Sequence, residues 1–255
     1  PVGSSKDDSP MFFIIVGLVL SVLMGVLINS KKKLREDATR ALIRPYNFFA
    51  DIRDHRIISG FATVFLMLIL AGSHSLLIAN ILFFLKNNLL FEKILLSYGL
   101  PTKIALLNYL AWNPYEAFIF FFVTSIVFFL FLSLLIYLSS FFIRTKIYFR
   151  SIFFTVVWAT LPIALTLPIK MVLYRILLIE EFNLFIFGFL AIYLLWIAKR
   201  VITGVSVIFD IGASRAYLFL FIIAFLSFGT FFLYFQIYHS SIYYLINAFN
   251  QFNLI

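Results

Sequence analysis

The chain has 255 residues, of which 64% are hydrophobic, 20% are aromatic and only 12% are charged. Soluble domains average about 45–50% apolar and about 25% charged residues, so this composition excludes an ordinary water-soluble fold and predicts an integral membrane protein. The net charge of +9 is typical of the basic loops of a membrane protein, and no nucleic-acid-binding motif accompanies it, so we expect no nucleic-acid partner.

Metal, cofactor and catalytic sites are not expected. The chain has no cysteine and only three histidines, a composition that does not suggest a zinc site. Metalloprotease, phosphate-loop, GxSxG and kinase signatures are missing, and the spans contain no paired aspartates. Glu180–Glu181 lies at a span boundary, and we interpret it as part of a solvated loop. We therefore predict that the protein is not an enzyme and has no catalytic, cofactor-binding or metal-binding residues.

Six stretches approach or exceed the roughly 20 apolar residues that a spanning helix needs. They are Met11–Ile28, Ile57–Leu82, Glu116–Leu138, Ser151–Tyr174, Phe182–Ala198 and Ala216–Tyr238. The fold class that follows is an all-α polytopic transmembrane bundle of about six spans. We divide the chain into an extracytoplasmic linker (1–10), an N-terminal transmembrane anchor (11–29), a basic segment (30–58) and a five-span membrane domain (59–255).

The first apolar stretch is typical of a membrane anchor. Pro1–Pro10 is small and polar, no basic cluster lies just before Phe12–Ile28, and Lys31–Lys33 follows it. A signal peptide would have its positive charges first and a small-residue cleavage site afterwards. The pattern favours an anchor whose N-terminus lies outside the cytoplasm.

The loops predict the orientation of the chain. Fourteen of the twenty basic residues lie in the loops after the first, third and fifth spans, which fall on one side of the membrane. Because basic residues favour the cytoplasm, we place these loops inside and both termini outside. We expect a bacterial cytoplasmic membrane rather than a eukaryotic endomembrane.

The basic segment Lys31–Arg56 is the longest polar run in the chain. LREDATRALIR has helical spacing, and Pro45 should end or kink that helix. One interpretation is a short helix on the inner membrane face, and the other is a solvated linker. We predict that this segment contacts anionic lipid and a protein partner at the cytoplasmic face. The predicted contact residues are Arg44, Pro45, Tyr46, Phe49, Asp51, Arg53 and Arg56.

The apolar pattern predicts how the second loop and the third span meet the membrane. In the outer loop Lys86–Asn113, two amphipathic segments flank Pro101, and we expect both to lie in the outer interface. The third span is apolar around its full circumference, so much of its surface should face lipid.

The fourth span contains the candidate helix kink at Pro162 and Pro168, each of which removes a backbone donor. Thr160 and Thr166 are close enough in sequence to satisfy the freed carbonyl groups locally. Lys170 should snorkel to the outer headgroups. The kink either shapes helix packing or marks a broken helix that lines a transport path.

His74 lies well inside the second span, among Gly72, Ser73, Ser75 and Asn80. Small polar neighbours of this kind suit helix–helix packing and interhelical hydrogen bonds. We interpret His74 as a neutral, hydrogen-bonded packing residue. The alternative, a proton relay, would need an acidic partner at similar depth.

The fifth span should end at Lys199–Arg200. The stretch that follows, residues 201–215, contains two glycines and Asp210, and we interpret it as an interfacial or re-entrant connector. Asp210 can pair with Arg200 or Arg215, or cap the last helix together with Ser214. The uncharged tail, residues 240–255, should form a short amphipathic helix on the outer face.

Three stretches resemble the Yip1-domain family of five-span membrane proteins. They are RPYNFFADIRDHR before the second span, WATLPIALTLP in the fourth, and LLWIAKRVITGVSVIFDIGASRAYLFL across the fifth and sixth. The resemblance covers about four-fifths of the chain and leaves the first span as an addition. It implies no catalytic residues. It implies partners recruited through cytoplasmic parts, since eukaryotic members are associated with Rab GTPase binding and vesicle traffic.

These observations predict a non-enzymatic membrane scaffold or adaptor that acts through its basic segment. Two alternatives remain open. One is a small-solute or lipid transporter that uses the kinked fourth span. The other is a membrane anchor for an extracytoplasmic N-terminal domain. The sequence does not indicate an oligomeric state.

Overall fold

We describe the protein from a computed structural model, which covers residues 11–55, 59–97, 101–143, 147–239, 243, 246 and 247. Every regular element in these residues is helical, which confirms the all-α fold. The predicted linker 1–10, Arg56 and most of the predicted tail lie outside the described residues.

Five helical segments are long and apolar enough to cross a membrane. They are α1 (Met11–Asn29), α4 (Gly60–Leu85), α7 (Pro114–Ile143), the broken helix of α8 (Phe149–Ala159), η1 (Leu161–Thr166) and α9 (Leu167–Leu177), and α10 (Asn183–Phe209). They match the first five predicted spans and identify an integral membrane protein. The sixth predicted span falls in α11 (Ala213–His239), which is not among the five, so the number of six stays a prediction.

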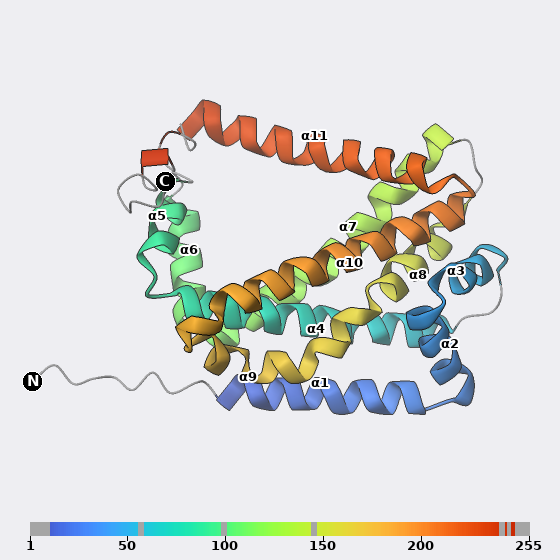
Figure 1. Cartoon of the computed structure of the whole chain (residues 1–255), viewed down its shortest axis with the longest axis horizontal. Coiled ribbons are helices and arrows are strands. Elements are labelled where there is room, and N and C mark those ends of the chain that lie inside the picture. Colours follow the sequence, from blue (N-terminus) through green and yellow to red (C-terminus); the bar gives the residue numbers. More distant parts are fainter. Residues whose placement is uncertain are drawn as a thin grey trace, which may run out of the picture.

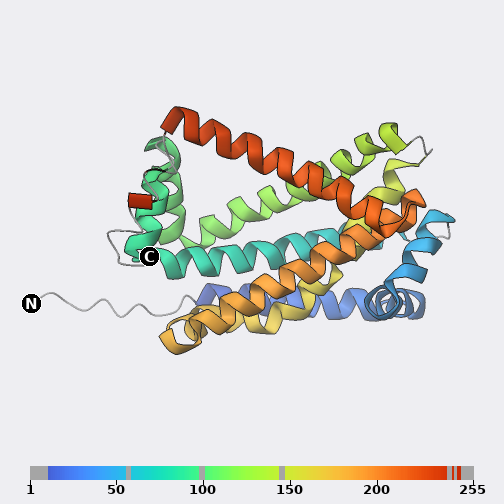
Figure 2. The ribbon, with the colours of Figure 1, turned by 45° about the horizontal axis from the view of Figure 1, so that its top comes forward.

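The spans run back and forth between two ends of the bundle (Figures 1 and 2). One end carries α2 (Lys32–Ile43) and α3 (Pro45–Arg53), together with the start of α8 and the end of α10. The opposite end carries α5 (Leu89–Ser97), α6 (Pro101–Trp112) and η2 (Glu180–Phe182). Both segments predicted for that loop are helical, and Pro101 is the first residue of α6. Their position in the outer interface stays a prediction.

The broken helix is the centre of the core. All residues from Ser151 to Ala159 are buried, and Trp158 is among the largest fully buried side chains. The Trp158 indole donates a hydrogen bond to the Thr63 hydroxyl (3.1 Å), and its ring lies 5.0 Å from that of Phe48. The bundle is therefore assembled around the fourth span, which was predicted as a kinked one.

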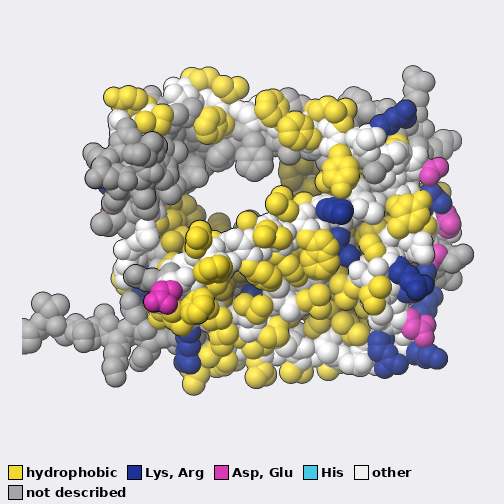
Figure 3. All heavy atoms as spheres, in the orientation of Figure 1, with side chains coloured by type: hydrophobic (Ala, Val, Ile, Leu, Met, Phe, Trp, Pro, Cys, Tyr) yellow, Lys and Arg dark blue, Asp and Glu magenta, His cyan; other side chains and the backbone are white. Residues whose placement is uncertain are grey.

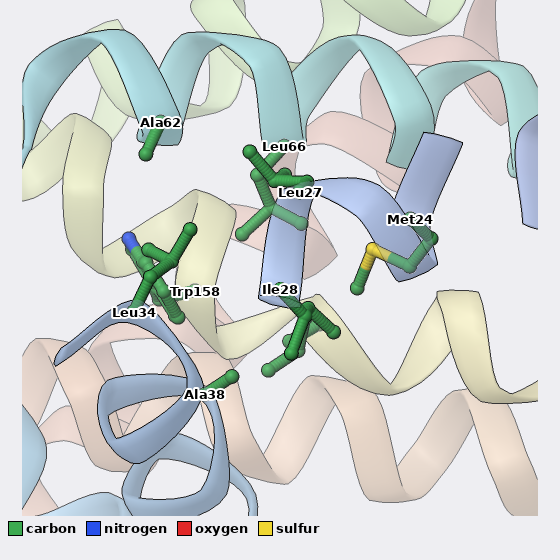
Figure 4. A pocket seen from close by; sticks show the side chains of 9 residues that line it. Met24, Leu27, Ile28, Leu34, Ala38, Ala62, Leu66 and Trp158 are labelled. Carbon is green, nitrogen blue, oxygen red and sulfur yellow. The ribbon is translucent and has the colours of Figure 1, made fainter. Parts of the chain in front are cut away.

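Figure 4 shows side chains of α1, α2 and α4 packed around Trp158 of this helix. Side chains of α1, α2 and α4 converge on Trp158 around a gap of about 10 Å³. The gap is lined by apolar side chains, including Met24, Leu34 and Leu66, so it is a packing seam and offers no polar group to a ligand.

The break occurs where the prolines predict it. α8 ends at Ala159, and Pro162 and Pro168 lie in the first turns of η1 and α9, where a missing N–H costs nothing. Thr160 donates to the Val156 and Val157 carbonyls, and Thr166 donates to the Ile163 carbonyl at 3.0 Å. Both threonines therefore bond to carbonyl groups beside the break. The carbonyl groups four residues before the two prolines belong to Trp158 and Ala164, so their satisfaction by these threonines stays a prediction.

The predicted end of the fifth span is wrong. α10 continues through Lys199–Arg200 to Phe209, so residues 201–209 are helix and not a connector. Arg200 lies inside this helix, and its guanidinium is buried and hydrogen-bonded. The backbone at Gly204 also packs so closely that an added Cβ would lie 2.5 Å from the Thr155 methyl group.

Candidate functional site

The α2–α3 platform, which we define as Lys32–Arg53, is the most distinctive surface of the molecule. Its inner face is apolar and buried, from Leu34, Ala38 and Ala41 in α2 to Phe48 and Phe49 in α3. Its outer face is basic and exposed. The exposed basic residues of this region are Lys31, Lys32, Lys33, Arg35, Arg40 and Arg44. Figure 3 shows Lys and Arg side chains gathered at this end. The segment is helical, as one of our two interpretations predicted.

Two of the seven predicted contact residues are buried, so their prediction as surface contacts is wrong. Phe49 is fully buried and faces Gly204 of α10. Asp51 is 9% exposed and forms an ion pair with Arg40. The sequence alternates aromatic and charged residues, but the helical period of α3 turns Phe49 and Asp51 toward the bundle and α2.

Four of the other predicted contact residues lie at the surface or the helix junction, and Arg56 lies outside the described residues. Tyr46 is 63% exposed and Arg44 is exposed, so both are available to a partner. Pro45 is the first residue of α3, which confirms that it ends the preceding helix. Arg53 is partly exposed and is paired with Asp54 and Asp210 at 3.1 Å each.

Arg200 joins the platform to the broken helix. Its side chain is 4% exposed, and its guanidinium donates to the carbonyls of Ala159 (3.0 Å), Leu42 (3.1 Å) and Ala41 (2.5 Å). These acceptors lie at the C-terminal ends of α8 and α2, where carbonyl groups lack helical partners and the helix dipole favours a cation. One side chain thus caps two helices that are far apart in sequence.

Charge pairs hold the platform together. Arg40 binds Asp51 across the α2–α3 junction and lies 3.9 Å from Asp37. Burial raises the pKa of the Asp37 carboxyl, and the opposing pull of Lys33 and Arg40 only partly offsets this effect. The hydrogen bond with Asp54 raises the pKa of the Arg53 guanidinium. The Arg40–Asp51 ion pair therefore fixes α2 against α3.

Asp210 pairs with neither Arg200 nor Arg215 but with Arg53, from α3. Asp210 follows the last residue of α10, and its backbone has a left-handed conformation (φ 53°, ψ 41°). This conformation directs its carboxylate toward the platform. A pocket of about 270 Å³ lies beside this pair. Its lining residues are Arg53, His55, Ile147, Ser151, Ile208, Phe209 and Asp210.

A second polar cluster occupies the middle of the bundle, at the break in the fourth span. Lys170 is 2% exposed, and its ammonium group donates to the Ser73 hydroxyl and the Ile163 carbonyl, both at 2.8 Å. The prediction that Lys170 snorkels to the headgroups is therefore wrong. The break leaves the Ile163 carbonyl within reach of the ammonium group, and that bond keeps Lys170 inside.

His74 lies in the same region and is hydrogen-bonded, as predicted. Its Nδ1 lies 2.9 Å from the Ser125 hydroxyl of α7. Ser75 donates to the Phe118 carbonyl, also in α7, and the Asn80 side-chain oxygen accepts from the Tyr174 backbone N–H of α9 (3.3 Å). Polar side chains of α4 therefore join α4 to both α7 and α9, as interhelical hydrogen bonds do in membrane bundles.

The sequence analysis did not predict that Lys170 and Arg200 are buried and bonded to backbone carbonyls inside the bundle. The sequence around Arg200 could have identified it, because residues 194–209 form a mainly apolar run. The other polar residues of this run are Lys199, Thr203 and Ser206. An ionisable residue inside a span is a functional candidate by default. The described residues contain no group of three or more His, Cys, Asp or Glu side chains that could hold a metal ion.

Comparisons with protein-family models, curated proteins and solved structures found no match to this chain.

Proposed function

We propose that this integral membrane protein is a non-enzymatic scaffold or adaptor that acts through the outer face of the α2–α3 platform. The observation that carries the proposal is the two-sided platform: its apolar face is fixed to the bundle, while its basic face and Tyr46 point outward. A preorganised surface loses little conformational entropy on binding. The basic face suits anionic headgroups or an acidic protein surface.

We place the platform on the cytoplasmic side, because basic residues favour that side, with both termini outside. On this orientation, anionic lipid of the inner leaflet meets Lys31–Lys33 at the start of α2. We also propose membership of the Yip1-domain family. The resemblance itself supports it, and so does the position of a short helical platform just before α4.

Photo-crosslinking from position 46 tests the proposal. Tyr46 is replaced by a benzophenone-bearing amino acid in native membranes, and adducts are identified by mass spectrometry. We expect one dominant protein adduct, because this side chain is exposed on the platform. The control replaces Tyr109, which is 51% exposed in α6 at the opposite end, and should lack that adduct.

A charge-neutralised variant provides the second arm. Changing Lys32, Arg35 and Arg44 to Gln should reduce recovery of the adduct at least severalfold without changing the melting temperature, because all three residues are exposed. Identical adducts from positions 46 and 109, or recovery that survives the neutralisation, would reject the adaptor proposal.

A second candidate function is transport of a small solute or lipid. The observation that favours it is the broken fourth span, where the buried Lys170 ammonium group binds the Ile163 carbonyl. Broken helices with ionised or polar partners near mid-membrane form the binding sites of many transporters.

The transport candidate is tested with a fluorescent phospholipid in reconstituted vesicles, where scrambling is read from quenching by a membrane-impermeant reductant. We expect wild-type scrambling to fall at least tenfold in Lys170→Met and in the double variant Pro162→Ala/Pro168→Ala. Lys199→Met, a change at an exposed lysine, should scramble normally. Wild-type vesicles that move no lipid would remove lipid transport from consideration.

A further inference from the structure

The pocket beside Arg53 is built from three parts of the chain. The end of α3 contributes Arg53, and the C-terminal end of α10 contributes Phe209 and the following Asp210. Ile147 lies just before α8, and Ser151 lies in its first turn. Its volume of about 270 Å³ is below the roughly 300–1,000 Å³ of sites that enclose a whole small molecule. The pocket therefore suits one polar group of a larger amphiphile.

The pocket presents both signs of charge on one wall. Arg53 and Asp210 lie 3.1 Å apart, and their side chains are 37% and 85% exposed. Both charges are thus open to a ligand although they pair with each other. A ligand with a single charge would be attracted to one of them and repelled by the other. A ligand with adjacent positive and negative groups can lie antiparallel to the pair and interact with both.

The backbone at the pocket is unusual. Among the described residues other than glycine, only His55 and Asp210 have positive φ (57° and 53°), and both line this pocket. Glycine would adopt this conformation at lower cost. Residues other than glycine in such sparsely populated conformations cluster at ligand-binding sites.

The surroundings place the pocket at headgroup depth. Tyr148, next to the pocket, is 69% exposed and packs its ring against His55 at 5.3 Å. The Arg150 guanidinium lies over the Phe154 ring at 5.1 Å. Exposed aromatic and basic side chains at the end of a span mark the membrane–water interface. Ile147, Ile208 and Phe209 supply the apolar part of the lining, toward the spans.

We propose that this pocket binds the ammonium–phosphate headgroup of an ethanolamine phospholipid. The phosphate lies against Arg53 and the Ser151 hydroxyl, and the ammonium group donates hydrogen bonds to Asp210. A choline headgroup lacks N–H donors for this carboxylate, and a glycerol headgroup lacks the positive charge. The site is therefore selective for ethanolamine lipid, and this selectivity does not depend on the adaptor function of the platform.

Native mass spectrometry of the purified full chain in detergent tests this proposal. The protein is mixed with equal amounts of phosphatidylethanolamine, phosphatidylcholine and phosphatidylglycerol with identical acyl chains. We expect the ethanolamine lipid to be retained at least threefold over each of the others. Asp210→Asn should abolish the preference, because it removes the negative charge and asparagine tolerates the left-handed conformation. Equal retention of the three lipids by the wild-type protein would overturn the proposal.

Two controls make the outcome specific. Asp54→Asn removes the other carboxylate bonded to Arg53, does not line the pocket, and should keep the preference. Changing Lys32, Arg35 and Arg44 to Gln should lower only phosphatidylglycerol binding, so a failure of the platform proposal is seen separately. Glycerophosphoethanolamine, which has the headgroup without acyl chains, should compete with phosphatidylethanolamine, because the pocket contacts the headgroup. Asp210→Gly should melt within a few degrees of wild type yet lose the preference. If it keeps the preference, the carboxylate does not select the lipid and the proposal fails.

Discussion

Replacing Arg200 with methionine is expected to lower the free energy of unfolding by about 3–5 kcal/mol, because three buried carbonyl groups lose a charged donor. The variant loses the charge and leaves the carbonyls of Ala159, Leu42 and Ala41 without their donor. Each buried acceptor left unsatisfied costs about 1–3 kcal/mol. α2 should detach first, because it loses two bonds and α8 loses one.

Thermal unfolding in detergent and limited proteolysis within α2 measure this effect. Lys199→Met is the matched control, since Lys199 is exposed on the same helix and its loss should change stability by no more than about 0.5 kcal/mol. Arg200→Lys should fall between the two, because an ammonium group is a compact charge that cannot reach three carbonyls in a fork. If Arg200→Met melts like the wild type, the linking role of this residue is refuted.

Trp158→Ala is expected to destabilise the protein by about 3–5 kcal/mol, as other large-to-small changes of buried aromatic residues do. Trp158 is 1% exposed, contacts Phe48 of α3 and donates to Thr63 of α4. Truncation therefore opens a cavity where α1, α2, α3 and α4 meet the fourth span. It also leaves the Thr63 hydroxyl without this donor.

Trp112→Ala is the control for this experiment, because Trp112 is 57% exposed at the end of α6. Its removal should leave the melting temperature nearly unchanged, and both variants can be followed by circular dichroism in the same detergent. Trp158→Phe should recover part of the loss by refilling the cavity without restoring the hydrogen bond. Equal stability of the two alanine variants would show that Trp158 is not the centre of the core.

The two proposed roles are physically connected through Arg200. Its guanidinium binds α2 at the base of the platform and α8 just before the break. Tyr193 of the same helix donates to the Pro162 carbonyl within the break. A partner that moves the platform would therefore act on α10 and the kinked fourth span, and a change at the kink would reach the platform surface.

The sequence by itself determined the membrane character, the presence of the first five spans but not the end of the fifth, the two prolines of the kink and the helix boundary at Pro45. Each of these depends on local chemistry: the length of an apolar run, or a residue that lacks a backbone donor. The hydrogen-bonded state of His74 was also predicted, although its partner, Ser125, lies in α7 and not among its neighbours in the same helix. The placement of the basic loops in the cytoplasm, the sixth span and membership of the Yip1-domain family stay predictions.

The tertiary structure alone decided where the charged residues lie. Lys170 was expected at the headgroups and Arg200 at the end of a span, since an isolated charge belongs in water. Both are buried because backbone carbonyls from other segments, at Ile163, Ala159 and Ala41, meet their donors. Asp210 likewise pairs with Arg53, which is 157 positions away in the sequence. Such partners are brought together only by packing, so residue type and spacing do not reveal them.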